Sequence, residues 1–263
     1  CLSKGYKSCI KKRCVKGSLF ASVVRVFSMK FHKMINVYKN VYAFITPSEF
    51  LKNKLALNGF EEKRIHCIPT FTASKTTIGE QQIGSYGLYF GRVTEEKGVE
   101  TVIKAYEKLP EYTVKIMGDD TTDEAKRLKK YVENHKMKNV EFLGFKSGEE
   151  LENVIKGARF TLIPSIWYDN LPNTALESFQ YSKPVIASNI GSLPELVIDG
   201  ENGYLFKPSN VEDLIKKIKM LDDDTLVKKM GQASRKRLES RFAPQTHYEE
   251  LMKIFNEAVK SRK

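Results

Sequence analysis

The chain has little cysteine, histidine or tryptophan and no long apolar run. Its 263 residues include four Cys, four His and one Trp. A membrane-spanning helix is not expected, because no stretch of 18 or more uncharged apolar residues occurs. The low cysteine count fits reduced thiols inside a cell. We therefore expect a cytoplasmic protein whose contact with the inner membrane face, if it makes one, is peripheral.

The cysteines and histidines are not spaced like the ligands of a metal ion. Cys1, Cys9 and Cys14 contain no CxxC pair, and Cys67 lies far along the chain. The histidines, at positions 32, 66, 135 and 247, form no HxH or HxxxH pair. A zinc site that combines the three N-terminal cysteines with a distant fourth ligand is a minor alternative. We predict no metal site, and surface or packing roles for the histidines.

Positive charge is concentrated in the N-terminal segment. The net charge is +12, and residues 1–48 contain ten of the 44 Lys and Arg residues but none of the 32 acidic ones. The rest of the chain is nearly balanced, so a basic groove for nucleic acid is not predicted.

The same basic segment has helical periodicity. From Phe20 to Tyr38, apolar residues recur at helical spacing, and most of the basic residues lie off that stripe. Two interpretations stay open for residues 18–40. A helix packed on its own domain with a solvated basic face is favoured over a helix that approaches anionic lipid.

Short apolar runs alternate with amphipathic stretches along the rest of the chain. Residues 41–46 and 64–68 predict strands, and between them a helix begins at Ser48 and ends near Gly59. Residues 71–84 are polar and predict an interdomain linker. Six strands then each precede a helix, which predicts one doubly wound α/β domain with a parallel sheet over residues 85–241. The strands are expected at residues 87–90, 113–117, 140–143, 160–163, 185–188 and 204–206.

Two carboxylates mark the carboxyl end of the fourth of these strands. Asp169 and Glu177 are eight residues apart and span the junction between a loop and a predicted helix. Ligands of open α/β sheets bind at such turns, so this segment is a candidate site. An alternative for Asp169 is an Asx-type turn that caps the helix.

Two cations follow the first strand of the same domain, in the motif GRVTEEKG. Gly91 permits a sharp turn, and Arg92 and Lys97 stand where the free N–H groups of a helix already favour anions. The motif suits a diphosphate, although a charged helix start without a ligand is equally compatible with it alone. Two cations and two carboxylates together suit a nucleotide sugar. A dinucleotide site is not predicted, because the chain has no GxGxxG motif.

Five ordered blocks carry a family resemblance: YFGRVTEEKGVETVIKAY, VKIMGDD, VEFLGFKSGEELENVIKGARFTLIPS, WYDNLPNTALESF and SKPVIASNIGSLPELVIDGENGYLF. With them, residues 85–241 resemble the C-terminal, nucleotide-sugar-binding domain of the retaining GT-B glycosyltransferases of family 4. Residues 1–70 then correspond to an incomplete N-terminal Rossmann-like domain on the acceptor side. The resemblance also implies that residues 242–263 form a helix that crosses back to that domain.

The resemblance implies roles for matching positions. Arg92 and Lys97 would hold the diphosphate of the sugar donor and stabilise negative charge as the nucleoside diphosphate leaves. Glu177 would bind the ribose, and Asp169 would contact the donor sugar. The other implied substrate contacts are Gly91, Thr174, the backbone N–H groups of Asn170 and Leu171, and the loop at Phe145 and Lys146 beside the nucleobase.

Two departures from the family pattern change these expectations. Asp169 replaces the usual Glu, which could retract the carboxylate by roughly 1.5 Å. Most of the N-terminal domain has no counterpart here, so we expect a fragment that binds a nucleotide and transfers sugar poorly or not at all.

For the intact enzyme, the resemblance implies transfer of a sugar from a nucleotide diphosphate sugar to a hydroxyl with retention of configuration. A glycan or lipid-linked acceptor, in cell-surface polysaccharide or glycolipid synthesis, is expected. No metal or other cofactor is implied, because Arg92 and Lys97 neutralise the diphosphate. A nucleotide-sugar-binding protein without activity is the first alternative, and an epimerase or a phosphorylase is a more distant one.

Overall fold

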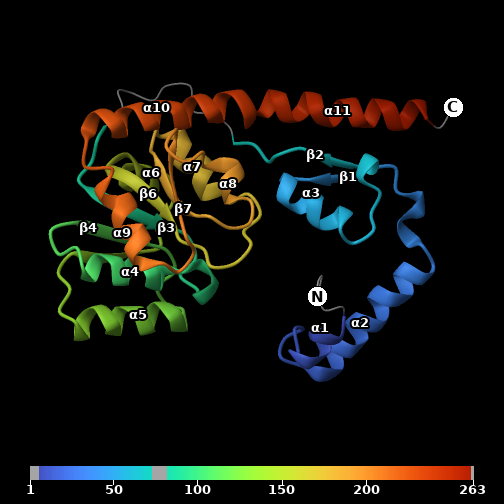
Figure 1. The fold of residues 1–263 in the computed structure, drawn as a ribbon, viewed down its shortest axis with the longest axis horizontal. Coiled ribbons are helices and arrows are strands. Elements are labelled where there is room, and N and C mark those ends of the chain that lie inside the picture. The colour runs from blue at the N-terminus through green and yellow to red at the C-terminus, as the bar shows by residue number, and fades with distance from the viewer. Residues whose placement is uncertain (1–5, 73–81, 262–263) are drawn as a thin grey trace.

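The computed structural model describes residues 6–72 and 82–261 (Figure 1). Most of the predicted linker, residues 71–84, and Cys1 lie outside these ranges. Two parallel sheets organise the described residues. The smaller one pairs β1 (Phe44–Thr46) with β2 (Ile65–Cys67).

The larger sheet has six strands, all parallel, in the order β5-β4-β3-β6-β7-β8. Its strands are β3 (Tyr86–Phe90), β4 (Thr113–Met117), β5 (Val140–Gly144), β6 (Ala158–Ile163), β7 (Val185–Ser188) and β8 (Gly203–Phe206). The direction of winding reverses between β3 and β6, so the carboxyl ends of these two strands form the topological switch point. The predicted α/β doubly wound architecture is confirmed.

Helices cover both faces of this sheet (Figure 1). Buried side chains of α4 (Val99–Glu107), α5 (Asp123–Asn134) and α9 (Val211–Lys219) pack on one face. Those of α6 (Gly148–Lys156), α7 (Asn173–Gln180) and α8 (Leu193–Leu196) pack in two clusters on the other. The long helix α10 (Asp224–Arg241) contributes to both faces. Burial on both faces explains why the strands are continuous apolar runs rather than alternating ones.

The last helix, α11 (Pro244–Lys260), lies beside the segment that follows β2 (Figure 1). A ring nitrogen of His247 lies 2.7 Å from the carbonyl oxygen of Pro69, and its ring centroid lies 4.8 Å from that of Phe71. The C-terminal helix therefore contacts the N-terminal part of the chain.

The N-terminal residues form α1 (Lys7–Lys11), α2 (Leu19–Met34), the 3-10 turns η1 (Val37–Asn40) and η2 (Glu62–Arg64), and α3 (Glu49–Ala56). The helix predicted to reach Tyr38 is shorter than expected, because Asn36 adopts a left-handed conformation with φ 48°. Similarly, the strand predicted from residue 41 begins only at Phe44.

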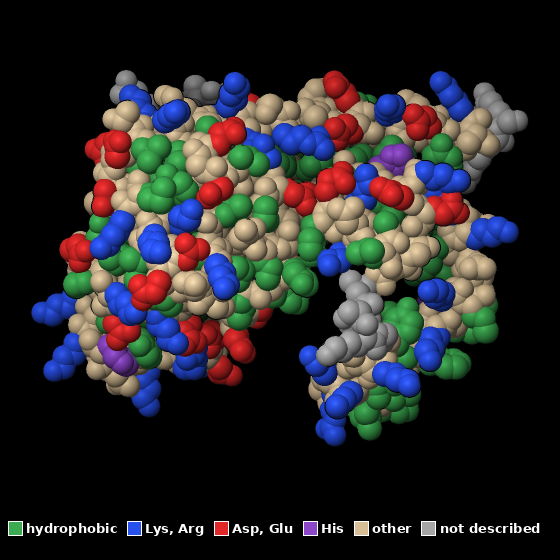
Figure 2. Space-filling model, viewed as in Figure 1, with side chains coloured by type: hydrophobic (Ala, Val, Ile, Leu, Met, Phe, Trp, Pro, Cys, Tyr) green, Lys and Arg blue, Asp and Glu red, His purple; other side chains and the backbone are tan. Residues whose placement is uncertain are grey.

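Much of the apolar side of α2 is uncovered. Phe20, Phe27 and Met34 are 79%, 71% and 72% exposed, so the described residues do not pack over this face as the favoured interpretation expected. Figure 2 shows Lys, Arg and hydrophobic side chains together over α1 and α2, without acidic ones. Within the described ranges, no helix combines the length and the apolar character needed to cross a membrane.

Candidate functional site

The loops that follow β3 and β6 meet at the topological switch point. Gly98 lies between them with φ 68°, and a Cβ atom there would come within 2.1 Å of the carbonyl oxygen of Pro164. Only glycine permits this approach. The N–H of Ile166 also donates to the carbonyl oxygen of Glu96, at 3.0 Å. The two motifs singled out in the sequence are thus joined through their backbones.

An ion pair joins the same two loops through their side chains. Lys97 Nζ lies 2.6 Å from Asp169 Oδ1, and Asp169 is only 7% exposed. Two further groups donate to this carboxylate, Ser165 Oγ to Oδ2 and Trp167 Nε1 to Oδ1, the latter at 3.2 Å. Three donors satisfy and orient the buried carboxylate, as its burial requires.

The backbone around Asp169 is fixed by Ser192, the residue that precedes α8. Ser192 Oγ accepts from the N–H of Leu171 at 2.6 Å and donates to the carbonyl oxygen of Asp169 at 2.9 Å. Leu171 has φ 56°, a conformation that bulky residues adopt only when neighbours hold it. The resemblance implied that the N–H of Leu171 contacts the ligand. In the structure, this N–H instead donates its hydrogen bond to Ser192.

Asp169 does not cap α7. The N-cap residue of α7 is Pro172, and no side chain caps this helix. The alternative of an Asx-type capping role for Asp169 is wrong, because Lys97, Ser165 and Trp167 bind its carboxylate instead. The side chain of Asn170 also has a partner elsewhere in the protein, since its Oδ1 accepts a hydrogen bond from Ser48 Oγ at 2.6 Å.

A cavity of about 210 Å³ opens between the two loops. Among the predicted site residues, its lining contains Gly91, Arg92, Lys97, Asp169 and Thr174. The sequence reasoning did not single out three further polar residues of the lining, which are Tyr89, Ser165 and Asn173. A more open depression of about 390 Å³ lies along α1 and α2, where Phe20, Val24 and other mostly apolar residues line it. The smaller cavity has the convergent polar groups typical of a ligand site.

The remaining predicted site residues lie outside the lining of the 210 Å³ cavity. Glu177 is half-buried on α7, and burial raises the pKa of its carboxyl above the usual value. Phe145 is 75% exposed, and Lys146 pairs with Glu150 at 3.5 Å. The structure therefore gathers Arg92, Lys97 and Asp169 of the predicted diphosphate and sugar contacts, and it leaves the predicted ribose and nucleobase contacts at the periphery.

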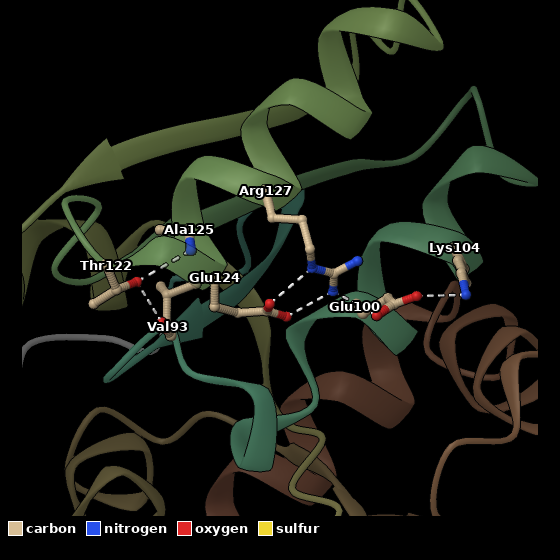
Figure 3. A network of polar contacts seen from close by, with 7 residues as sticks. All are labelled: Val93, Glu100, Lys104, Thr122, Glu124, Ala125 and Arg127. Atoms are coloured by element: carbon tan, nitrogen blue, oxygen red, sulfur yellow. Dashed lines mark hydrogen bonds and ion pairs between the residues drawn. The ribbon is translucent and has the colours of Figure 1, made fainter.

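Hydrogen bonds from Tyr89 and Thr122 hold the backbone of the loop after β3. Tyr89 donates to the carbonyl oxygen of Arg92 at 2.5 Å, and burial raises the pKa of the Tyr89 phenol, which keeps it neutral. Thr122 caps α5 and donates to the carbonyl oxygen of Val93 at 2.6 Å (Figure 3). The loop that carries both cations is thus held on α5.

An ion-pair network joins α5 to α4 beside that support (Figure 3). Arg127 lies 2.6 Å from Glu100 and 2.8 Å from Glu124, and Lys104 lies 2.5 Å from Glu100. Hydrogen bonds from Lys104 and then Arg127 lower the pKa of the Glu100 carboxyl. These pairs are partly exposed, so their role is to fix geometry more than to add stability.

Comparison with known proteins identifies the family. The family described as "Glycosyl transferases group 1" matches residues 77–237. The chain belongs to this family.

Relatives with similar sequences include one archaeal protein and one bacterial protein. An uncharacterized glycosyltransferase of Methanocaldococcus jannaschii is 28% identical over 230 residues, which cover 87% of this chain and 60% of that protein. A glycogen synthase of Mycobacterium tuberculosis is 31% identical over 186 residues, 67% of this chain and 42% of the enzyme. The chain thus spans about half the length of the curated relatives that it matches.

Solved structures show the same fold. A glycosyltransferase from Rickettsia africae has a TM-score of 0.77 at 21% identity, over 86% of this chain and 66% of that one. Anabaena HepE in complex with UDP-glucose has a TM-score of 0.71 at 20% identity, over 84% of this chain and 64% of that one. These similarities confirm the predicted GT-B-type fold class.

Proposed function

We propose that this chain is the sugar-donor-binding part of a retaining glycosyltransferase of family 4. The enzyme would transfer a sugar from a nucleotide diphosphate sugar to a hydroxyl acceptor. The observation that carries this proposal is the Lys97–Asp169 pair at the switch point between β3 and β6, with Arg92 in the same cavity. Ligands of open α/β sheets bind at that position.

The two cations suit a diphosphate. Arg92 is exposed and lines the cavity, so its guanidinium can fork onto two phosphate oxygens. An arriving diphosphate competes with Asp169 for the ammonium of Lys97. When the bond between the anomeric carbon and the diphosphate breaks, the negative charge that develops on the leaving oxygen would lie between the positive charges of Arg92 and Lys97.

The carboxylates suit the hydroxyls of the same ligand. Once Lys97 turns to the diphosphate, Asp169 Oδ1 can accept from a hydroxyl of the donor sugar, with Thr174 and Asn170 at the edge of the site. Glu177, on the same helix as Thr174, would accept from the ribose. Phe145 and Lys146, on the loop after β5, would flank the nucleobase.

Uracil is the base that the comparisons favour. HepE structures contain UDP and UDP-glucose, and their fold matches this chain with TM-scores of 0.71 to 0.75. A role in cell-surface polysaccharide is supported by a capsular polysaccharide glycosyltransferase of Staphylococcus aureus, 24% identical over 177 residues. The acceptor would then be a glycan or a lipid-linked glycan at the cytoplasmic face of the membrane.

The exposed side chains of the N-terminal segment are compatible with binding to a membrane surface. Arg25, Lys33 and Lys39 are exposed beside the uncovered apolar side chains of α2. Basic and apolar groups on one exposed segment are the combination that binds anionic lipid headgroups. We propose peripheral contact between residues 18–40 and the membrane.

Thermal unfolding with UDP-, GDP- and ADP-sugars tests the proposed function. At least one of them should raise the melting temperature of the wild type, because a ligand that binds only the folded chain stabilises it. The Arg92→Ala/Lys97→Ala double variant should lose this shift, whereas a Lys228→Ala/Lys253→Ala control on α10 and α11 should keep it. No shift in the wild type, or an equal shift in the double variant, contradicts the diphosphate assignment.

A further inference from the structure

We infer that Ser48 and Glu195 are positioning residues that hold the loop of Asp169 against α3, and so set the sugar specificity of the site. The inference rests on the proposed function, since Asp169 is there a contact of the donor sugar. Neither residue lines the cavity. Both act through contacts between the N-terminal part of the chain and the six-stranded domain.

Glu195 caps a helix that belongs to another part of the chain. Its Oε2 accepts from the N–H of Glu49 at 2.8 Å, and its Oε1 accepts from the N–H of Phe50 at 2.6 Å. These are N–H groups of the first turn of α3, which have no partner inside the helix. A carboxylate at a helix N-terminus is also stabilised by the helix dipole. Glu195 thereby fixes α3 on α8.

Ser48 makes the second contact. Its Oγ accepts from the N–H of Leu51 at 3.2 Å, as an N-cap of α3, and donates to Asn170 Oδ1 at 2.6 Å. The Ser48 side chain is fully buried, so both contacts are shielded from water. One hydroxyl thus joins the start of α3 to the residue next to Asp169.

Aromatic side chains make the third contact. The ring centroids of Phe50 and Tyr168 are 5.0 Å apart, and Lys54 Nζ lies 5.1 and 5.4 Å from them. Aromatic pairs and cation–π contacts of this geometry are attractive. Together with Asn170, Tyr168 places contacts to α3 on both sides of Asp169.

A continuous set of contacts runs from α3 to the Asp169 backbone. Ser192, three residues before Glu195, contacts the carbonyl oxygen of Asp169 through both Oγ, at 2.9 Å, and N–H, at 3.2 Å. Gly191 lies close against this carbonyl group, and a Cβ atom at that position would come within 2.9 Å of the oxygen. The first turn of α8 therefore holds α3 through Glu195 and the Asp169 loop through Ser192. Undocking α3 should loosen the Asp169 loop, while Arg92 stays on its own loop.

The single Trp of the chain reports this directly, without any ligand. Trp167 is 55% exposed and its Nε1 donates to Asp169 Oδ1, so a looser loop gives the indole more rotational freedom. In Glu195→Ala and Ser48→Ala, the steady-state anisotropy of the Trp167 fluorescence should therefore be clearly lower than in the wild type. Hydrogen exchange should accelerate about tenfold at the amides of Glu49 and Phe50 in Glu195→Ala. Glu195→Gln, which keeps one acceptor oxygen, should be intermediate.

Two controls separate this role from general destabilisation. The amide of Ala125, capped by Thr122 within α5, should exchange as in the wild type. Glu257→Ala, which removes an exposed carboxylate from α11, should change neither fluorescence nor exchange. If the fluorescence anisotropy of Glu195→Ala and Ser48→Ala equals that of the wild type, or if Ala125 accelerates as much as Glu49 and Phe50, the inference is overturned.

Calorimetric titration with UDP and UDP-glucose adds the functional readout. In Glu195→Ala, affinity for UDP-glucose should fall about fivefold while affinity for UDP stays the same, because only the sugar contact depends on the Asp169 loop. An equal loss for both ligands contradicts the inference. If the wild type binds neither ligand, the proposed function fails, and the fluorescence and exchange results still decide whether α3 holds the loop.

Discussion

Lys97 Nζ lies 2.6 Å from Asp169 Oδ1, although the two residues are 72 positions apart in the chain. One follows β3 and the other follows β6, so the parallel sheet brings them to the point where its strand order reverses. The two charges neutralise each other. In the proposed function, the cation would bind phosphate and the carboxylate would bind sugar hydroxyls, and the fold keeps the two side by side.

The pairing predicts opposite effects of Asp169→Asn on two ligands. The variant frees Lys97 from its internal partner, so affinity for UDP should rise by about threefold, the scale of a partly solvated ion pair. Affinity for UDP-glucose relative to UDP should fall, because the amide is a weaker acceptor for sugar hydroxyls. Calorimetric titration measures both. A loss of UDP affinity would show that Asp169 does not compete with the diphosphate.

Glu177 predicts a pH dependence of nucleotide binding. Burial raises the pKa of this carboxyl, so it takes up a proton at a higher pH than an exposed glutamate does. The ionised form is the better acceptor for ribose hydroxyls, and UDP affinity should therefore weaken as the pH falls through this raised pKa. Glu177→Gln should bind more weakly at pH 8 and lose most of this pH dependence. An unchanged profile in the variant would exclude Glu177 as the titrating group.

Low pH weakens the proposed nucleotide binding through Glu177, but the same residue stabilises the folded chain at low pH. Because the pKa of the folded state is raised, the neutral carboxyl favours the folded chain at low pH. This contribution is lost as the pH rises through the raised pKa. In Glu177→Gln without ligand, the free energy of unfolding should decline less over that range, which urea titration at several pH values measures.

Lys183 predicts a structural requirement outside the site. Only 1% of this residue is exposed, and its Nζ donates to the carbonyl oxygens of Gln82, Lys156 and Ala158 at 2.6, 2.6 and 2.8 Å. Lys183→Met would remove these three hydrogen bonds and lower the free energy of unfolding by about 3 kcal/mol. Urea unfolding measures this, with the exposed Lys253→Met as the control. A loss equal to that of the control would show that the three bonds contribute nothing.

Lys183 also predicts how stability responds to alkaline pH. Burial lowers its pKa from 10.5 to about 8, so between these values the unfolded chain binds the proton and the folded chain does not. The ionisation of Lys183 therefore makes the free energy of unfolding rise with pH across that window. Lys183→Met should lose this contribution, and an identical pH profile in both proteins would contradict it.

The exposed basic residues of the N-terminal segment predict binding to anionic vesicles. Changing Arg25, Lys33 and Lys39 to Glu should abolish sedimentation with vesicles that contain phosphatidylglycerol, because each basic residue near such a surface contributes about 1 kcal/mol. The matched control reverses three exposed lysines of α10 and α11, which are Lys228, Lys236 and Lys253. Equal losses in both triple variants would indicate general electrostatics rather than a surface on residues 18–40.

The sequence predicted the elements more reliably than the contacts between them. Continuous apolar strands and the glycines at 91 and 98 are local signals. The sheet and the loop with Arg92 and Lys97 could therefore be predicted from the sequence alone. Ser48 was predicted as the start of a helix, and it is the N-cap of α3. Its contact with Asn170 and the contacts of Glu195 with α3 could not be predicted, because the partners lie 122 to 146 positions away and neither residue type is unusual. The early end of α2 was missed as well, since it depends on the left-handed conformation of Asn36.

The Asp169 loop shows the same limit. Its carboxylate was predicted as a site residue, but its three hydrogen-bond donors come from three positions, and Lys97 joins it only through the fold. The N–H of Leu171 was directed toward a ligand on the basis of resemblance, yet Ser192 Oγ accepts its hydrogen bond. Sequence patterns identify which groups are present, whereas the partners that occupy them follow from tertiary packing.

Calorimetric titration of UMP and UDP tests most directly the central claim, that Arg92 and Lys97 hold the diphosphate of a nucleotide sugar. The wild type should bind UDP at least about tenfold more tightly than UMP, because the second phosphate lies between two cations. In Arg92→Ala/Lys97→Ala, UDP affinity should fall to that of UMP, with UMP affinity little changed. If the variant keeps the preference for UDP, or loses UMP and UDP affinity equally, the two cations do not form the diphosphate site.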